Sequence, residues 1–264
     1  MSSRSVLPFL LLAGLAALIA LSYSALSAAS VRNAKADPVE PATLLEPPPR
    51  APAPAPEPKP ARPKPPRPDL AVVRGSVPLR ARPNGRVVTR VEAHTEFGGQ
   101  RVMSIVARRG PWLGVVATEL PNGRLGWVSS HNRGLALRRT AYSLHADLSG
   151  RWLELRRGRR VVRRLNVAVG RPGSDTPTGR FAVTDKLSGG SFGAYYGCCV
   201  LALNGHQPRL PAGWQGGDRL AIHGTDSPAT IGAAASAGCL RAADADLHVL
   251  MRRVPLGTPV FIHS

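Results

Sequence analysis

The chain has 264 residues, which is enough for one or two domains with extensions. It carries 35 lysines and arginines against 16 aspartates and glutamates, and the resulting net charge of +19 favours polyanionic surroundings such as nucleic acid, anionic lipid or an acidic polymer. Aromatic residues are scarce, and the sequence has neither a zinc-ligand spacing nor a glycine-rich phosphate loop, so we expect no nucleic-acid partner, no metal and no cofactor. Basic residues occur in every segment, which predicts a general affinity for anions.

The first thirty residues are apolar. Residues 6–29 read VLPFLLLAGLAALIALSYSALSAA after Arg4, a run long enough to span a bilayer as a helix. The small residues of Ala25-Leu26-Ser27-Ala28 are typical of a cleavage site, so we predict a signal peptide or a membrane anchor over residues 1–30 and slightly favour the anchor. Either interpretation places the rest of the chain in the extracytoplasmic envelope, anchored to the membrane or secreted.

Residues 31–69 are predicted to be a disordered linker. Positions 38–68 include 14 prolines in 31 residues. Proline fixes φ and donates no backbone hydrogen bond, so this stretch is expected to act as a semi-rigid spacer without helix or sheet. We interpret it as a stalk that carries the folded part away from the membrane.

Residues 70–138 have the pattern of a small antiparallel β-barrel. Short β-rich runs alternate with turn signals such as Asn84-Gly85 and Asn122-Gly123. The fragments LRARPNG and GWV resemble bacterial SH3-like domains, which bind wall peptides or position a partner domain. We expect Trp112 and Trp127 to be core residues more than ligand platforms, because aromatic side chains dominate protein cores.

From residue 139 onwards the sequence again predicts mostly β structure. Apolar residues between 152 and 169 indicate a hairpin that turns at Arg157-Gly158. The stretch TPTGRF, residues 176–181, is typical of a turn between strands. Near the end, VLMRRVPLGTPVFI predicts a short helix followed by a closing strand at 259–262.

Three cysteines in an exported chain leave at least one unpaired. Cys198 and Cys199 are adjacent, and they are expected to be either bridged to each other or simply buried, with burial preferred for at least one because a bridge between neighbours needs a strained ring. Tyr195 and Tyr196 precede them and line a substrate cleft or pack in the core; the sequence leaves both interpretations open.

The candidate catalytic residues lie in residues 221–241, which read AIHGTDSPATIGAAASAGCLR. This stretch places His223 and Cys239 sixteen positions apart among small residues. Cysteine attacks as the thiolate and needs a base, and imidazole is the side chain whose unperturbed pKa lies near neutrality. A lone cysteine is more often a small buried hydrophobe, so this pair by itself leaves a structural role open.

The order and spacing of the residues in this stretch favour the catalytic role. His-Gly-Thr, a spacer of about a dozen residues and Ser-x-Gly-Cys-Leu-Arg closely resemble the signature of L,D-transpeptidase (YkuD-like) catalytic domains, and TPTGRF resembles a second fragment of that family. The likeness spans residues 141–264 and implies a mostly β fold, a twisted sheet or sandwich with short helices. It also implies acyl transfer on peptidoglycan stem peptides, which are the expected partner, with anionic cell-wall polymers as a further one.

The resemblance assigns roles to individual residues. Cys239 is the nucleophile, His223 the base, and the carbonyl of Gly224 holds the imidazole, although Asp226 and Asp218 are also near in sequence. Backbone N–H groups around Gly238 and Cys239 are expected to form an oxyanion hole.

Substrate contacts are expected from Arg241, which suits a carboxylate, from Ser236, which shapes the turn or binds substrate, and from Gly238 and Tyr196. One departure is Ala237, where the family often has histidine, and we expect it to change substrate preference or rate. The alternatives are a non-catalytic wall-binding protein, which has no need of an intact His–Cys pair, and a cysteine peptidase that hydrolyses wall peptides.

Overall fold

The structure is a computed structural model that describes residues 69–264. The predicted signal or anchor segment and the proline-rich linker lie outside the described residues. Within residues 69–264, no helix has the length and apolar character needed to cross a membrane.

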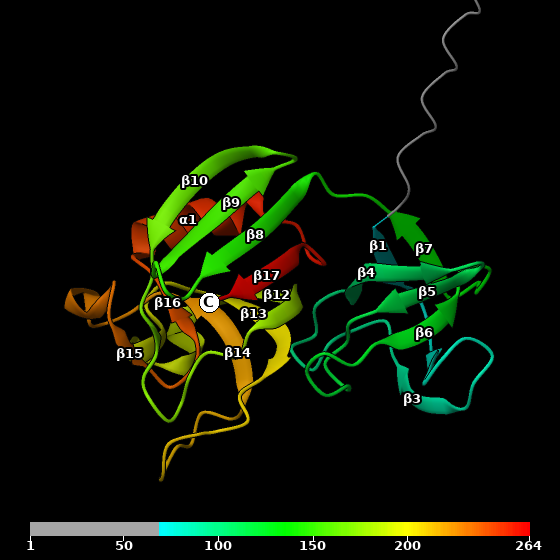
Figure 1. Cartoon of the computed structure of the whole chain (residues 1–264), viewed down its shortest axis with the longest axis horizontal. Helices are drawn as coiled ribbons and strands as arrows, with labels where there is room; N and C mark the ends of the chain where they lie inside the picture. The colour runs from blue at the N-terminus through cyan, green and yellow to red at the C-terminus, as the bar shows by residue number, and fades with distance from the viewer. Residues whose placement is uncertain (1–68) are drawn as a thin grey trace, which may run out of the picture. The chain divides into compact units, whose positions relative to one another are not determined.

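The first part of the described chain is a seven-stranded antiparallel sheet in the order β3-β2-β6-β5-β4-β1-β7 (Figure 1). Its strands are β1 (Leu70–Val73), β2 (Val77–Arg80), β3 (Val87–Val91), β4 (Val102–Arg109), β5 (Trp112–Val115), β6 (Gly126–Ser129) and β7 (Leu135–Arg138). The turns lie at residues that the sequence predicted for turns, and Asn84 and Gly123 among them have positive φ. Trp127 is buried and Trp112 is half-buried. The strands agree with the predicted β domain, whereas its SH3-like character stays a prediction.

The second part is built on an eight-stranded sheet in the order β10-β9-β8-β17-β12-β13-β14-β16, and Figure 1 shows β10, β9, β8 and β17 side by side. Its strands are β8 (Tyr142–Asp147), β9 (Trp152–Arg157), β10 (Arg160–Asn166), β12 (Gly179–Ser188), β13 (Cys199–His206), β14 (Arg219–His223), β16 (Leu240–Arg241) and β17 (Pro259–His263). A separate parallel pair joins β11 (Val169–Gly170) to β15 (Ala234–Ser236). The predicted turn at Gly158 and the predicted closing strand are both present.

Strand β12 connects the two halves of this sheet. Its first residues pair with β17, its last residues pair with β13, and the register shifts between Val183 and Asp185. Such an irregularity bends a strand and increases its twist. The sheet therefore turns at β12, and β13, β14 and β16 form the half that carries the functional motif.

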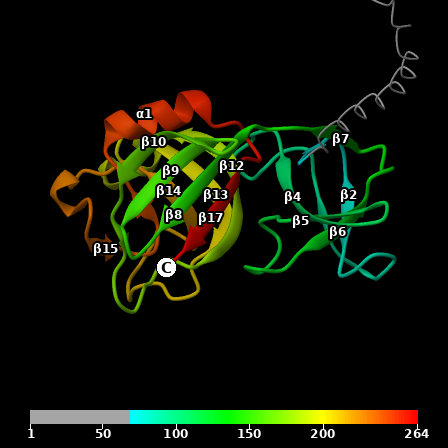
Figure 2. The ribbon, with the colours of Figure 1, turned by 45° about the horizontal axis from the view of Figure 1, so that its top comes forward.

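The remaining elements are short helices: η1 (Gly189–Phe192), η2 (Ala194–Tyr196), η3 (Pro228–Thr230) and α1 (Asp244–Arg253). Helix α1 packs against β13 and contributes the buried Leu247 and Leu250 to the core of this half of the chain (Figure 2). That core is made of alternate residues of the strands, as expected for a sheet with one face covered. It fixes β14 and β16 as rigid supports for the site.

Candidate active site

His223 is the last residue of β14 and is fully buried. Its Nδ1 lies 2.6 Å from the carbonyl oxygen of Gly224, so Nδ1 carries the proton and donates it there. Its Nε2 is buried and, among residues 69–264, has no hydrogen-bond partner. Burial, and then the positive charge of Arg241, lower the pKa of His223 to about 4. At neutral pH the imidazole is therefore neutral, with Nε2 as a free acceptor.

Cys239 directly precedes β16, which pairs in parallel with β14 so that Leu240 lies opposite Ile222 and Arg241 opposite His223. Because side chains alternate along a strand, Cys239, Arg241 and His223 face the same side. Cys239 is half-buried and is the free thiol of the described residues. The structure therefore places the predicted base at the end of β14 and the predicted nucleophile directly before β16, the strand that pairs with β14.

The Cys239 thiol is protonated in this site. Its Sγ donates to the carbonyl oxygen of Arg219 at 3.8 Å. Burial raises the pKa of the thiol to about 11, against the opposing effects of a hydrogen bond from the Ala221 backbone and the charge of Arg241. A thiolate forms here only when a base removes the proton.

The turn before Cys239 is held by Ser236, which is fully buried. The Ser236 hydroxyl donates to the carbonyl oxygen of Cys239 at 2.6 Å and accepts the N–H of Gly238 at 3.1 Å. Gly238 has φ +125, which a residue with a side chain rarely adopts. In this state the Gly238 N–H is engaged by Ser236, and the oxyanion hole around Gly238 and Cys239 stays a prediction. Ser236 and Gly238 both shape the turn.

Gln207 is a site residue that sequence reasoning missed. It is buried, and its Nε2 donates towards the carbonyl oxygens of Asp175 at 3.0 Å and of Ser174 and Ala237 at 3.2 Å. It thereby joins the loop that leads into TPTGRF to the turn of the nucleophile. A single glutamine in a loop after a strand carries no pattern that could have revealed this.

Two tyrosines cover the imidazole. The ring centroids of Tyr196 and Tyr195 lie 4.8 Å and 5.6 Å from that of His223, and Trp214 packs on Tyr195 at 5.8 Å. Both tyrosines are half-buried and line the cavity that reaches Cys239, which favours the cleft interpretation of these residues. Burial raises the pKa of both hydroxyls. The cavity holds about 10 Å³, so the site is closed in this state.

Arg241 adds a buried positive charge. It is 4% exposed, and its guanidinium lies 5.4 Å from the ring centroid of Tyr195. Within the described part of the chain its Nε has no hydrogen-bond partner. A buried guanidinium with an unused donor beside the thiol fits a negatively charged group of a substrate.

The two acidic residues near in sequence lie elsewhere. Asp218 contacts Nδ1 of His206 at 2.9 Å, and Asp226 accepts the hydroxyl of Ser227 at 3.0 Å. The group that fixes the tautomer of His223 is thus the Gly224 carbonyl.

Cys198 and Cys199 form a disulfide with each other, against the preference for simple burial. Cys199 is buried, and its carbonyl oxygen accepts the N–H of Gly224 at 3.0 Å. Cys198 donates its backbone N–H to Asp244 Oδ2 at 3.1 Å. These contacts place the bridge directly behind the Gly224 carbonyl that holds the imidazole, which compensates for the unusual ring.

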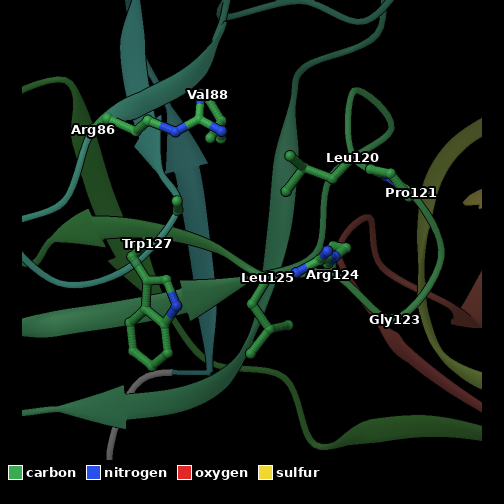
Figure 3. Close-up of a pocket in the computed structure, with 9 residues that line it drawn as sticks. Arg86, Val88, Leu120, Pro121, Gly123, Arg124, Leu125 and Trp127 are labelled. Carbon is green, nitrogen blue, oxygen red and sulfur yellow. The ribbon is translucent and has the colours of Figure 1, made fainter.

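A cavity of about 420 Å³ lies in the seven-stranded sheet. Figure 3 shows Arg86 and Val88 on one side of it, Trp127 on another, and Leu120 and Arg124 on a third. No cysteine, histidine or carboxylate lines this cavity, so within residues 69–264 it offers no nucleophile and no general base.

Comparison with known proteins agrees with the geometry of the Cys239 site. Residues 141–262 match the family model of the L,D-transpeptidase catalytic domain, YkuD. The match supports an L,D-transpeptidase catalytic domain in this chain. This domain contains every residue of the site described above.

Two curated proteins, both described as putative L,D-transpeptidases, are similar to part of this chain. YkuD of Bacillus licheniformis is 35% identical over 123 residues and YkuD of Bacillus subtilis is 34% identical over 124 residues, each match covering 46% of this chain. The chain spans 65% and 66% of the length of these relatives, slightly less than two thirds.

Solved structures of L,D-transpeptidases are also similar, at lower identity. The enzyme from Mycobacterium smegmatis is 15% identical, with a TM-score of 0.39 over 62% of this chain and 91% of that one. L,D-transpeptidase 1 of Mycobacterium tuberculosis is 16% identical, with a TM-score of 0.34 over 55% of this chain and 73% of that one. Both scores are low, and the assignment rests on the sequence match.

Proposed function

We propose that residues 139–264 form a cysteine acyltransferase that cross-links peptidoglycan stem peptides, with Cys239 as nucleophile and His223 as base. The observation that carries the proposal is the neutral imidazole of His223, whose Nδ1–H is fixed on Gly224 and whose unpartnered Nε2 lies on the same face of the sheet as the Cys239 thiol. A buried acceptor without a hydrogen-bond partner costs stability, and a catalytic role is one reason for a protein to retain it.

The reaction begins with proton transfer. Nε2 of His223 takes the thiol proton as Sγ of Cys239 attacks the carbonyl that links the third residue of a stem, meso-diaminopimelate, to the terminal D-alanine. The C–N bond breaks, the imidazolium returns its proton to the departing amine, and a thioester remains on Cys239. The amine of a second stem then attacks the thioester, and the thiol regains its proton.

Oxyanion stabilisation falls to the backbone of the turn. With the Gly238 N–H engaged by Ser236, the N–H of Cys239 is the donor at the correct position, next to the attacked carbonyl. Ser236 and Gly238 act by setting the shape of this turn, and Gln207 holds it from behind.

Arg241 and Tyr196 contact the substrate. The Arg241 guanidinium offers a planar fork to a stem carboxylate, and its burial strengthens that interaction. Because the cavity at Cys239 holds about 10 Å³, a stem enters only when the tyrosines or the loop of Trp214 move. Glycines flank the tyrosines at positions 193 and 197, both at positive φ, and they allow such movement.

We extend the proposal to the segments that precede residue 139. Residues 1–30 export or anchor the chain, residues 31–69 form a stalk and residues 70–138 form an SH3-like domain that positions the enzyme on the wall. The site of action is then the extracytoplasmic cell envelope, either at the membrane or secreted into the wall.

The decisive experiment is the intact mass of the full chain after incubation with a carbapenem, because β-lactams of that class are expected to acylate the nucleophile of this family. We expect one adduct on the wild type, none on Cys239→Ala and a greatly slowed adduct on His223→Ala. Asp147→Asn is the matched control, since the Asp147 carboxylate accepts hydrogen bonds from Ser149 and Gly150 at the end of β8, away from the imidazole, and it should react like the wild type.

An unmodified wild type with a titratable Cys239 thiol would count against the transpeptidase and favour the wall-binding protein. If the adduct forms, products from purified stem peptides separate transfer from hydrolysis. A dimer joined between third-position residues supports transfer, whereas shortened monomers alone identify a cysteine peptidase.

A further inference from the structure

The hairpin of β9 and β10 carries a concentration of arginine. Residues 156–164 read RRGRRVVRR, with six arginines in nine positions and no acidic residue among them. β10 is the edge strand of the eight-stranded sheet, so this charge lies at the rim of the domain. Basic residues occur in every segment, as noted above, and this hairpin adds a local concentration of them.

Three of the six arginines form ion pairs within the fold. Glu154, which is buried, binds the guanidinium groups of Arg156 and Arg164 at 2.5 and 2.6 Å. Asp246 of α1 binds Arg163 at 2.6 Å and ties the hairpin to the helix. These three pairs give those arginines a structural role.

The other three, Arg157, Arg159 and Arg160, are exposed and make no ion pair with any residue in the range 69–264. Arg157 and Arg160 line a cavity of about 340 Å³ together with Arg253, the last residue of α1. Figure 2 shows how α1 and β10 lie side by side around this place. Three arginines thus line one cavity, and no aspartate or glutamate is among its lining residues.

The geometry points to a binding site for a phosphate ester in this cavity, which we name the arginine cavity. A phosphate monoester carries close to two negative charges and three terminal oxygens, so three guanidinium forks can share it. A carboxylate has two oxygens and one charge, and it leaves one arginine unused. The half-buried Tyr142 adds a hydroxyl donor.

The lining also suits the organic part of such an ester. Val161 is 44% exposed, which is unusual for a valine, and it lines the cavity with Val162. They offer apolar contact to a short carbon chain such as glycerol. The site makes no use of Cys239 or His223 and does not rest on the proposed catalysis.

The test uses glycerol 3-phosphate in solution and vesicles of phosphatidylcholine with or without phosphatidic acid, which present the same head group from two sources. Binding to the full chain is measured by calorimetry and by co-sedimentation at low ionic strength, where charge interactions are least screened. The variant is the triple substitution Arg157→Ser, Arg160→Ser and Arg253→Ser.

The matched control is the triple substitution Arg74→Ser, Arg82→Ser and Arg90→Ser. These arginines are exposed on the seven-stranded sheet, lie outside the arginine cavity and make no ion pair in the described part of the chain, so the control loses the same charge. We expect the cavity triple to weaken binding at least about tenfold, as for loss of charged hydrogen bonds, and the control by less than about threefold. Cys239→Ala should bind like the wild type, which separates this test from that of the proposed function.

The two probes identify the source of the phosphate. Binding to phosphatidic acid vesicles alone assigns the cavity to a membrane surface, and binding to glycerol 3-phosphate alone assigns it to a soluble or polymer-borne ester. The proposal is overturned if neither probe binds, if the two triples bind alike, or if glutarate binds as tightly as glycerol 3-phosphate.

Discussion

Gln207 provides a sharp test of how the nucleophile is positioned. Its Nε2 shares two protons among the carbonyl oxygens of Ser174, Asp175 and Ala237, and its Oε1 accepts the N–H of Arg209 at 3.0 Å. The substitution Gln207→Ala leaves these groups without their partner in a buried place. At about 1 kcal/mol for each of the two donated bonds, we expect a loss of about 2 kcal/mol in the free energy of unfolding.

That loss corresponds to a decrease in melting temperature of about 4–8 °C, which thermal unfolding followed by circular dichroism would measure. The turn of Ala237 also loses its rear support, and displacement of a nucleophile by about 1 Å costs up to about a hundredfold in rate. We therefore expect carbapenem acylation of Cys239, followed by intact mass, to slow by about tenfold or more well below the melting temperature.

Gln100→Ala is the control for this experiment. Gln100 also donates two hydrogen bonds, to the carbonyl oxygens of Val73 at 2.6 Å and Ala93 at 2.9 Å, but it does so in the seven-stranded sheet and is exposed. It should lose less stability and acylate at the wild-type rate. An unchanged acylation rate in Gln207→Ala, or an equal decrease in both variants, would refute the positioning role.

Three further predictions concern the same half of the chain. Because burial lowers the pKa of His223 to about 4, the imidazole stays neutral down to that pH; acylation rates should be level around neutrality and fall only below about pH 5, and an acid limb centred near 6.5 would contradict this. Gly238→Ala places a methyl group against the Gln207 side chain at φ +125, so its urea unfolding curve should show a loss of about 2–3 kcal/mol. Reduction of the Cys198–Cys199 disulfide opens a very short loop and should lower stability by only about 1 kcal/mol, with thiol titration rising from one to three per chain.

The sequence was sufficient for the features that depend on local pattern. Alternating apolar residues and Gly158 predicted the β9–β10 hairpin. The motif around His223 and Cys239 pointed to two residues that the fold places at the end of β14 and directly before β16, its paired strand. A repeated chemical pattern along the chain can be seen without knowing what packs against it.

Features that depend on distant partners could not be predicted. Arg163 is ion-paired because Asp246, 83 positions away in the sequence, is brought to it by the packing of α1. Arg157 has no such partner among residues 69–264, and the sequence alone does not distinguish the two arginines. The engagement of the Gly238 N–H by Ser236 depends on the conformation of one turn, which no periodicity encodes.

The two pKa values of the proposed dyad have a mechanistic consequence. With the thiol of Cys239 near 11 and the imidazole of His223 near 4, the proton resides on sulfur, and transfer to Nε2 in the closed, empty site costs on the order of 10 kcal/mol. An ion pair of thiolate and imidazolium is therefore not preformed. The free-energy cost of charge separation falls only when sulfur attacks a carbonyl carbon. The carbonyl oxygen then takes the negative charge and is stabilised by the backbone N–H donor of the turn.

Burial under Tyr195 and Tyr196 is the main cause of this free-energy cost of proton transfer, because desolvation makes the largest contribution to both pKa shifts. Movement of Tyr196 to admit a stem peptide exposes the imidazole, raises its pKa and strengthens the base as the substrate arrives. The closed state thus keeps Cys239 as an unreactive thiol that is protected from oxidants, because the thiolate and not the thiol is the form that reacts. The same movement of Tyr196 would therefore admit the substrate and activate the nucleophile.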